Sequence, residues 1–87
     1  MGQSLQKSVF SRGYKTFLAQ LRDARRAAGL TQENLAQRLG QTQSFVSKCE
    51  RGERRIDVIE LRMFCQALGV SFTGFVRRLD GSLRSRV

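Results

Sequence analysis

The sequence contains no histidine, proline or tryptophan, and only two cysteines and seven acidic residues stand among its 87 residues. Without histidine, the chain lacks the side chain that most often transfers protons or binds metals near neutral pH. Two cysteines make neither a disulfide framework nor a zinc site. The sequence shows no nucleophile–base pair, metal cluster or phosphate-binding loop, so we expect a protein that is not an enzyme and uses no cofactor.

Long hydrophobic runs are also missing. No stretch approaches the ~20 apolar residues that cross a bilayer, and the N-terminus lacks the apolar segment of a secretory signal. The cysteines, Cys49 and Cys65, fall on apolar faces of helical patterns, where a reduced thiol packs as a small hydrophobic side chain. These features favour a protein of the reducing cytoplasm.

The charge of the chain is strongly one-sided. Lysine and arginine number 16 against 7 acidic residues, which gives a formal net charge of +9. On so small a domain this excess favours a polyanionic partner, most often a nucleic acid. Charge alone leaves two alternatives open, a basic protein that is merely soluble and one attracted to anionic lipids. Composition does not choose between DNA and RNA.

Apolar residues recur at spacings of three and four, the period of an α-helix, along most of the chain. Five helices are expected, each bounded by a capping residue or a glycine, over about residues 12–28, 32–39, 43–51, 58–68 and 72–80. Asp57 and Glu60 have the spacing of a capping box. The fourth helix is expected to bury Val58, Leu61, Phe64, Cys65 and Leu68.

No segment alternates with a period of two for long enough to form a strand. The expected fold class is therefore all-α, a single compact domain of five helices over residues 12–80. Residues 1–11 are expected to form a flexible arm with Val9 and Phe10 as its apolar pair. Asp80 and Gly81 are expected to close the last helix, which leaves residues 81–87 as a basic tail.

The third expected helix carries a polar stripe. Because an α-helix turns by about 100° per residue, one arc collects several polar side chains while the opposite arc is apolar. Glutamine pairs well with adenine, lysine reaches guanine acceptors or phosphate, serine serves either, and an α-helix fits the major groove of B-DNA. Any amphipathic surface helix has a polar side, so the stripe alone is weak support for DNA binding. The residues of the stripe are Gln43, Ser44, Ser47, Lys48 and Arg51.

Residues 32–51, QENLAQRLGQTQSFVSKCER, resemble the helix-turn-helix of the phage repressor/Cro-type family, also called the XRE family. Ala36 and Gly40 stand at the small position and the turn position of that motif. Cys49 departs from it, because isoleucine or leucine is more usual there. The flanking stretches RRAAGLTQ and ERGERRIDVIELRMFCQALGVS also look like this family, so that the resemblance covers about residues 14–79.

The resemblance implies a lambda-repressor-like domain of five helices, found in bacterial or phage-encoded cytoplasmic transcriptional regulators, most often repressors. It implies binding to double-stranded DNA through the third helix. It also implies a homodimer on a two-fold symmetric operator, with recognition helices spaced by one DNA turn, about 34 Å. An antitoxin-type or other protein-interaction module of the same fold remains the alternative, as does a helical domain that keeps the fold without binding DNA.

Residue by residue, the resemblance implies a set of base contacts, a set of DNA-backbone contacts and one structural ion pair between Arg25 and Glu50. Phe45 has two open interpretations, contact with a thymine methyl group and shielding of the second helix. The implied base-contacting residues are Gln43, Ser44 and Lys48. The implied backbone-contacting residues are Thr31, Gln32, Ser47, Arg51, Arg54 and Arg55.

Overall fold

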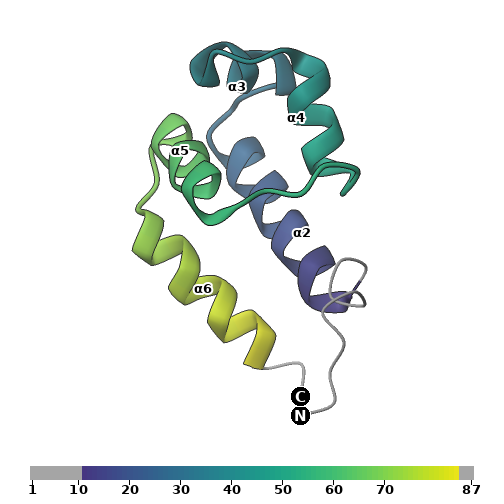
Figure 1. Cartoon of the computed structure of the whole chain (residues 1–87). Coiled ribbons are helices and arrows are strands. Elements are labelled where there is room, and N and C mark those ends of the chain that lie inside the picture. The colour runs from purple at the N-terminus through teal and green to yellow at the C-terminus, as the bar shows by residue number, and fades with distance from the viewer. Residues whose placement is uncertain (1–10, 85–87) are drawn as a thin grey trace.

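The computed structural model describes residues 11–84 of the chain. Along them run five α-helices and no strand (Figure 1), as the helical periodicity predicted. The expected flexible arm lies outside the described residues except for Ser11, which instead caps the first helix by accepting a hydrogen bond from the Tyr14 N–H at 3.2 Å. The helices are α2 (Arg12–Ala27), α3 (Gln32–Leu39), α4 (Gln43–Glu50), α5 (Val58–Leu68) and α6 (Phe72–Arg84).

The helix starts are set by side chains that satisfy free backbone N–H groups, as expected for Thr, Asp and Ser at these positions. Asp57 Oδ1 accepts from the Glu60 N–H at 2.7 Å, while Glu60 Oε1 accepts from the Asp57 N–H at 3.0 Å, which completes the predicted capping box. A second capping box, between Thr31 and Asn34, begins α3. Ser71 Oγ accepts from the Gly74 N–H at 3.0 Å at the start of α6.

All five helices contribute to one hydrophobic core. α3 and α4 lie together at one end of the molecule, α5 packs beneath α3, and α6 runs beside α2 at the other end (Figure 1). This arrangement holds α4 at the edge of the domain with only one side covered. The large side chains with less than 2% exposure are Leu21, Leu35, Val46, Cys49, Phe64 and Cys65.

The expected burial of Val58 is wrong, because its side chain is 62% exposed. Val58 is the first residue of α5 and lies at the end of the helix, where no neighbouring helix covers it. Ile56, which precedes the cap, packs against the core instead. The neighbouring Ile59 is 66% exposed, so the start of α5 presents an apolar surface to solvent.

The last helix was expected from the sequence to end at Asp80 and Gly81, but it continues to Arg84. A glycine inside a helix costs only about 1 kcal/mol relative to alanine, which tertiary packing easily offsets. Leu83, in the added turn, lies against α2. Its Cδ2 is 3.6 Å from the point that a Cβ added to Gly13 would occupy. Part of the expected basic tail therefore belongs to the folded domain.

The extended α6 makes Gly81 a position where alanine is expected to stabilise the fold, by about 0.5–1 kcal/mol. Gly81 is helical, and no neighbouring atom lies within 4 Å of an added Cβ. Urea unfolding of Gly81→Ala measures the gain. Gly74→Ala is the matched control, because its Cβ would lie 3.3 Å from Ser71 and the gain should be smaller or absent. A destabilised Gly81→Ala would mean that the helix ends before this residue.

Candidate nucleic-acid interface

The chain turns from α3 into α4 within three residues, Gly40 to Thr42. Gly40 takes the left-handed conformation, with φ 67° and ψ 32°, which costs residues with a Cβ roughly 1–2 kcal/mol. The Gln41 N–H donates to the Ala36 carbonyl at 2.9 Å, and Thr42 Oγ1 accepts from the Phe45 N–H at 3.1 Å. With Ala36 buried at 3% exposure, α3 and α4 pack closely through this turn.

α4 turns a polar side outward. Gln43, Ser44 and Lys48, the three implied base-contacting residues, are all exposed and lie on one arc of the helix. Within the described part of the chain, none of the three side chains makes a hydrogen bond or an ion pair. These side chains are therefore available to a partner, while Val46 and Cys49 on the opposite side are fully buried.

Phe45 lies between these two sides of α4. Its side chain is half-buried, and its ring centroid is 6.3 Å from that of the buried Phe64. The guanidinium of Arg54 stacks over the same ring at 4.8 Å. These contacts favour the structural role of Phe45 over a thymine contact, because the ring already contacts Phe64 and Arg54.

The end of α4 is anchored by a buried ion pair between Arg25 of α2 and Glu50, the pair that the family resemblance implied. Arg25 Nε donates to Glu50 Oε2 at 2.7 Å, and a second guanidinium nitrogen donates to Oε1 at 3.1 Å. The Glu50 side chain is 2% exposed and that of Arg25 10%. A third bond, from Arg25 to the Leu30 carbonyl at 2.8 Å, ties the same guanidinium to the loop before α3.

Two further residues join this network, although nothing in the sequence connected them to it. Gln32 Nε2 donates to Glu50 Oε1 at 3.0 Å, and Arg22 donates to the Glu50 carbonyl at 2.8 Å. Gln32 was expected to hold a DNA phosphate, but in this structure its amide nitrogen links α3 to α4. The partners are 18 and 28 residues apart in sequence, so no local spacing indicates them.

Opposing effects act on the pKa of the Glu50 carboxyl group. Burial raises its pKa, but the hydrogen bonds from Arg25 and Gln32, together with the charges of Arg25 and Arg22, lower it by more. The net result is a pKa below the usual range for glutamate. The carboxylate is therefore ionised at neutral pH, and the network that positions α4 is fully formed there.

Acid is expected to weaken the fold through Glu50. Because the pKa of Glu50 is lowered in the folded state, the unfolded chain binds the proton at a higher pH than the folded protein does. The stability that Glu50 contributes is therefore complete above the unfolded-state pKa of about 4.3, and it is lost as the pH falls through the folded-state pKa. Urea unfolding of the wild type between pH 7 and pH 3 measures the loss. NMR titration of the Glu50 carboxyl carbon identifies the group, and a midpoint above that of the unfolded chain would contradict the assignment.

Arg51 and Arg54, two implied backbone contacts, are paired with carboxylates of the protein. Arg51 Nε donates to Glu53 Oε2 at 2.8 Å, and its guanidinium also donates to Ser47 Oγ. Arg54 donates from two guanidinium nitrogens to the two carboxylate oxygens of Glu60, at 2.8 and 2.9 Å. Glu53 and Glu60 were not singled out as functional residues from the sequence.

The remaining implied backbone contacts are more open. Arg55 stacks over the Tyr14 ring at 5.5 Å, and no carboxylate pairs with it in the region that the structure describes. Thr31 is exposed at the start of α3, where its hydroxyl caps the helix. The implied site residues come from three neighbouring segments, which are α4, the start of α3 and the loop before α5 (Figure 1).

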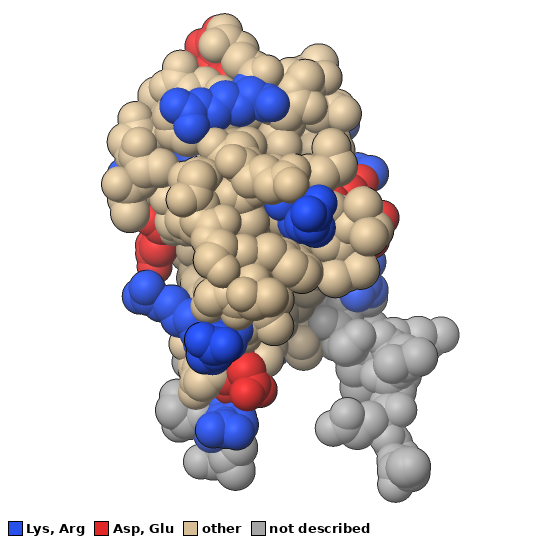
Figure 2. All heavy atoms as spheres, turned by 90° about the vertical axis from the view of Figure 1, so that its left-hand side faces the viewer, with Lys and Arg blue, Asp and Glu red and all other residues tan. Residues whose placement is uncertain are grey.

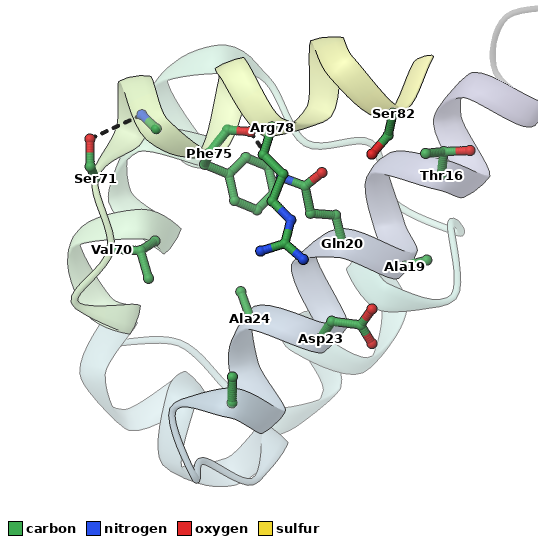
Figure 3. Close-up of a pocket in the computed structure, with 12 residues that line it drawn as sticks. Thr16, Ala19, Gln20, Asp23, Ala24, Val70, Ser71, Phe75, Arg78 and Ser82 are labelled. Carbon is green, nitrogen blue, oxygen red and sulfur yellow. Dashed lines mark hydrogen bonds between the residues drawn. The ribbon is translucent and has the colours of Figure 1, made fainter. Parts of the chain in front are cut away.

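A groove of about 490 Å³ lies between α2 and α6 (Figure 3). Gln20 crosses it and donates to the Phe75 carbonyl at 2.8 Å, while the Arg78 side chain points into the space above Ala24. None of the described residues that line the groove belongs to α3 or α4, so it is separate from the candidate interface.

Among residues 11–84, no group of three acidic or cysteine side chains is placed to hold a metal ion. No described helix is long and apolar enough to cross a membrane.

Comparison with known proteins identifies this arrangement. A family model described as helix-turn-helix matches residues 21–75. An uncharacterised helix-turn-helix-type transcriptional regulator of Sinorhizobium fredii, y4dJ, is 46% identical over 56 residues, which cover 64% of this chain and 73% of that protein. An XRE-family-like protein from Pseudomonas syringae pv. tomato has 42% identity and a TM-score of 0.82, over 92% of this chain and 98% of that chain. The clp gene regulator ClgR of C. glutamicum has 28% identity and a TM-score of 0.71, over 83% and 94%.

The chain is a helix-turn-helix protein of the lambda-repressor-like fold. It belongs to the XRE family of DNA-binding domains, because the family model covers more than half of the chain and the relatives match closely along most of its length. The resemblance found in residues 32–51 is therefore confirmed.

Proposed function

We propose that this protein is a sequence-specific transcriptional regulator that places α4 in the major groove of double-stranded DNA. The observation that carries the proposal is the free polar arc of Gln43, Ser44 and Lys48 on a helix whose other side is fixed in the core. The groove is about 12 Å wide, which matches a helix with its side chains. The regulator relatives named above support the assignment.

Base contacts are proposed to discriminate between DNA sequences, and backbone contacts to bind phosphates of any sequence. Gln43 is suited to adenine through its paired donor and acceptor, and Lys48 to guanine acceptors, each good contact contributing about 1–3 kcal/mol of discrimination. Thr31 and Gln32 lie at the N-terminus of α3, where exposed backbone N–H groups and the helix dipole attract a phosphate. Arg55, with which no carboxylate of the described residues pairs, supplies a cation for the DNA backbone. Ser47, Arg51 and Arg54 are proposed as further backbone contacts, the two arginines after leaving their carboxylates.

The proposed assembly is a homodimer on two half-sites, and the outward side of α5 supports it. Ile59 and Met63, four residues apart, point away from the core with 66% and 47% exposure, and Val58 beside them is 62% exposed. The side of the molecule that carries α5 and α6 is mostly uncharged, with scattered basic and acidic side chains (Figure 2). A second copy covering this apolar surface would remove it from water.

Repression is the proposed mode, because a bound dimer occupies DNA that a polymerase would need, and the proposed location is the cytoplasm, where that DNA lies. Selection of bound duplexes from a random pool tests the function. The expected result is a two-fold symmetric consensus with half-site centres one helical turn, about 34 Å, apart. Equal affinity for random and selected duplexes would reject a sequence-specific regulator.

A further inference from the structure

Two of the three arginines that follow α4 are neutralised by the protein itself. Arg51 is paired with Glu53 at 2.8 Å, and Arg54 with Glu60 at 2.8 Å. The arginine hydrogen bonds lower the pKa of both carboxyl groups, so the carboxylates stay ionised at neutral pH. The basic loop beside the candidate interface therefore carries less free positive charge than its sequence indicates.

The position of Arg54 is fixed by more than its ion pair. Its guanidinium stacks over Phe45 of α4 at 4.8 Å and donates to the Arg55 carbonyl at 2.8 Å. These contacts keep Arg54 beside the exposed arc of α4 whether or not Glu60 is bound. Removing the carboxylate would thus expose a cation at the interface rather than release the side chain into solvent.

We infer that Glu53 and Glu60 limit the affinity for DNA, because they occupy Arg51 and Arg54 in the free protein and thereby weaken phosphate contacts with DNA of any sequence. The inference rests on the proposed function, because it concerns the same DNA-binding surface. A phosphate competes with a carboxylate for either guanidinium, whereas the proposed base-contacting residue Gln43 has no competing partner among the described residues. Sequence-blind attraction is reduced, and the contacts that distinguish bases are left unchanged.

The two ion pairs are weak enough to open in a well-fitted complex. The side chains of Arg51 and Glu53 are 53% and 55% exposed, and those of Arg54 and Glu60 are 43% and 25% exposed. Exposed pairs of this kind contribute little stability, because water and salt screen them. A phosphate held in place by a cognate duplex can replace the carboxylate, while a poorly fitted duplex gains less from the exchange.

Glu53→Gln and Glu60→Gln test the inference, each measured for binding to a random duplex and to the duplex selected by the protein, over a range of salt concentrations. Glutamine also serves in a capping box, so Glu60→Gln keeps the start of α5. Affinity for the random duplex is expected to rise about two- to five-fold per substitution. The plot of log K against log salt should steepen by up to about 0.9 for each arginine that gains a phosphate. Affinity for the selected duplex should rise by at least as much, because that complex also displaces the carboxylates, so the ratio of specific to non-specific affinity should not fall.

Asp80→Asn is the matched control, because it removes the same charge from another exposed pair, Asp80 with Arg84 on α6, at the other end of the molecule. It should leave the salt slope unchanged. Adding Arg51→Gln to Glu53→Gln should cancel the gain, since the freed cation is then absent.

Three results would overturn the inference. These are a gain from Asp80→Asn as large as that from Glu53→Gln, a gain that survives Arg51→Gln, or no change on the random duplex. Failure of the wild type to bind any duplex would instead reject the proposed function, and this inference with it.

Discussion

Glu50→Ala is expected to lower the free energy of unfolding by about 3–5 kcal/mol, the cost of breaking a buried ion pair by removing one partner. The Arg25 side chain is only 10% exposed in the wild type, so the substitution leaves a buried guanidinium without its carboxylate, and it also removes the acceptor of the Gln32 amide. Small domains are stable by about 5–15 kcal/mol in total, so the variant should be close to unfolding at moderate temperature. Urea or thermal unfolding followed by circular dichroism measures the loss.

An exposed ion pair provides the comparison for this experiment. Asp80→Ala breaks the pair of Asp80 with Arg84, whose side chains are 63% and 79% exposed, and should change stability by no more than about 1 kcal/mol. A Glu50→Ala variant that unfolds like Asp80→Ala would show that the buried network does not hold α4 in place.

Gln43→Ala is expected to weaken binding to the selected duplex by about 1–3 kcal/mol while leaving binding to a random duplex nearly unchanged. The side chain is exposed and makes no hydrogen bond within residues 11–84, so the fold should not be affected. The slope of log K against log salt should stay the same, because no phosphate contact is lost. Fluorescence anisotropy with both duplexes, at several salt concentrations, separates these two effects.

Arg55→Ala should show the opposite pattern, because its exposed guanidinium is proposed to contact a phosphate rather than a base. Affinity for both duplexes should fall alike, and the salt slope should become shallower by about 1. Loss of specificity in Arg55→Ala, or a uniform loss in Gln43→Ala, would reverse the roles assigned to the two residues. A parallel unfolding measurement checks that the contact of Arg55 with Tyr14 is dispensable for the fold.

Helix positions could be predicted from the sequence because they depend on residues close together in the chain. The capping of α4 by Thr42 and the Asp57–Glu60 box each join residues three apart, and apolar spacing indicates the buried side of each helix. The polar arc of α4 follows from the same spacing. The pairing of Arg25 with Glu50 followed from the family resemblance, not from periodicity.

Val58 and the end of α6 show where local patterns fail. Val58 has the right spacing for the buried side of α5, but burial depends on whether another helix covers that end. Gly81 has a low helix propensity, but the last turn of α6 forms beside α2, near Gly13. In both cases the outcome depends on contact between segments distant in sequence, which spacing along one helix does not contain.

The amino-acid sequence alone determined the all-α class, the helix-turn-helix over residues 32–51 and the hydrophilic side of α4, since each arises from interactions within a few residues. Only the tertiary structure decided which charges remain free. Packing brought Gln32 and Arg22 to Glu50, and it placed Arg54 between Phe45 and Glu60. Pairing of charged side chains depends on distances through space, and folding sets those distances after the local elements have formed.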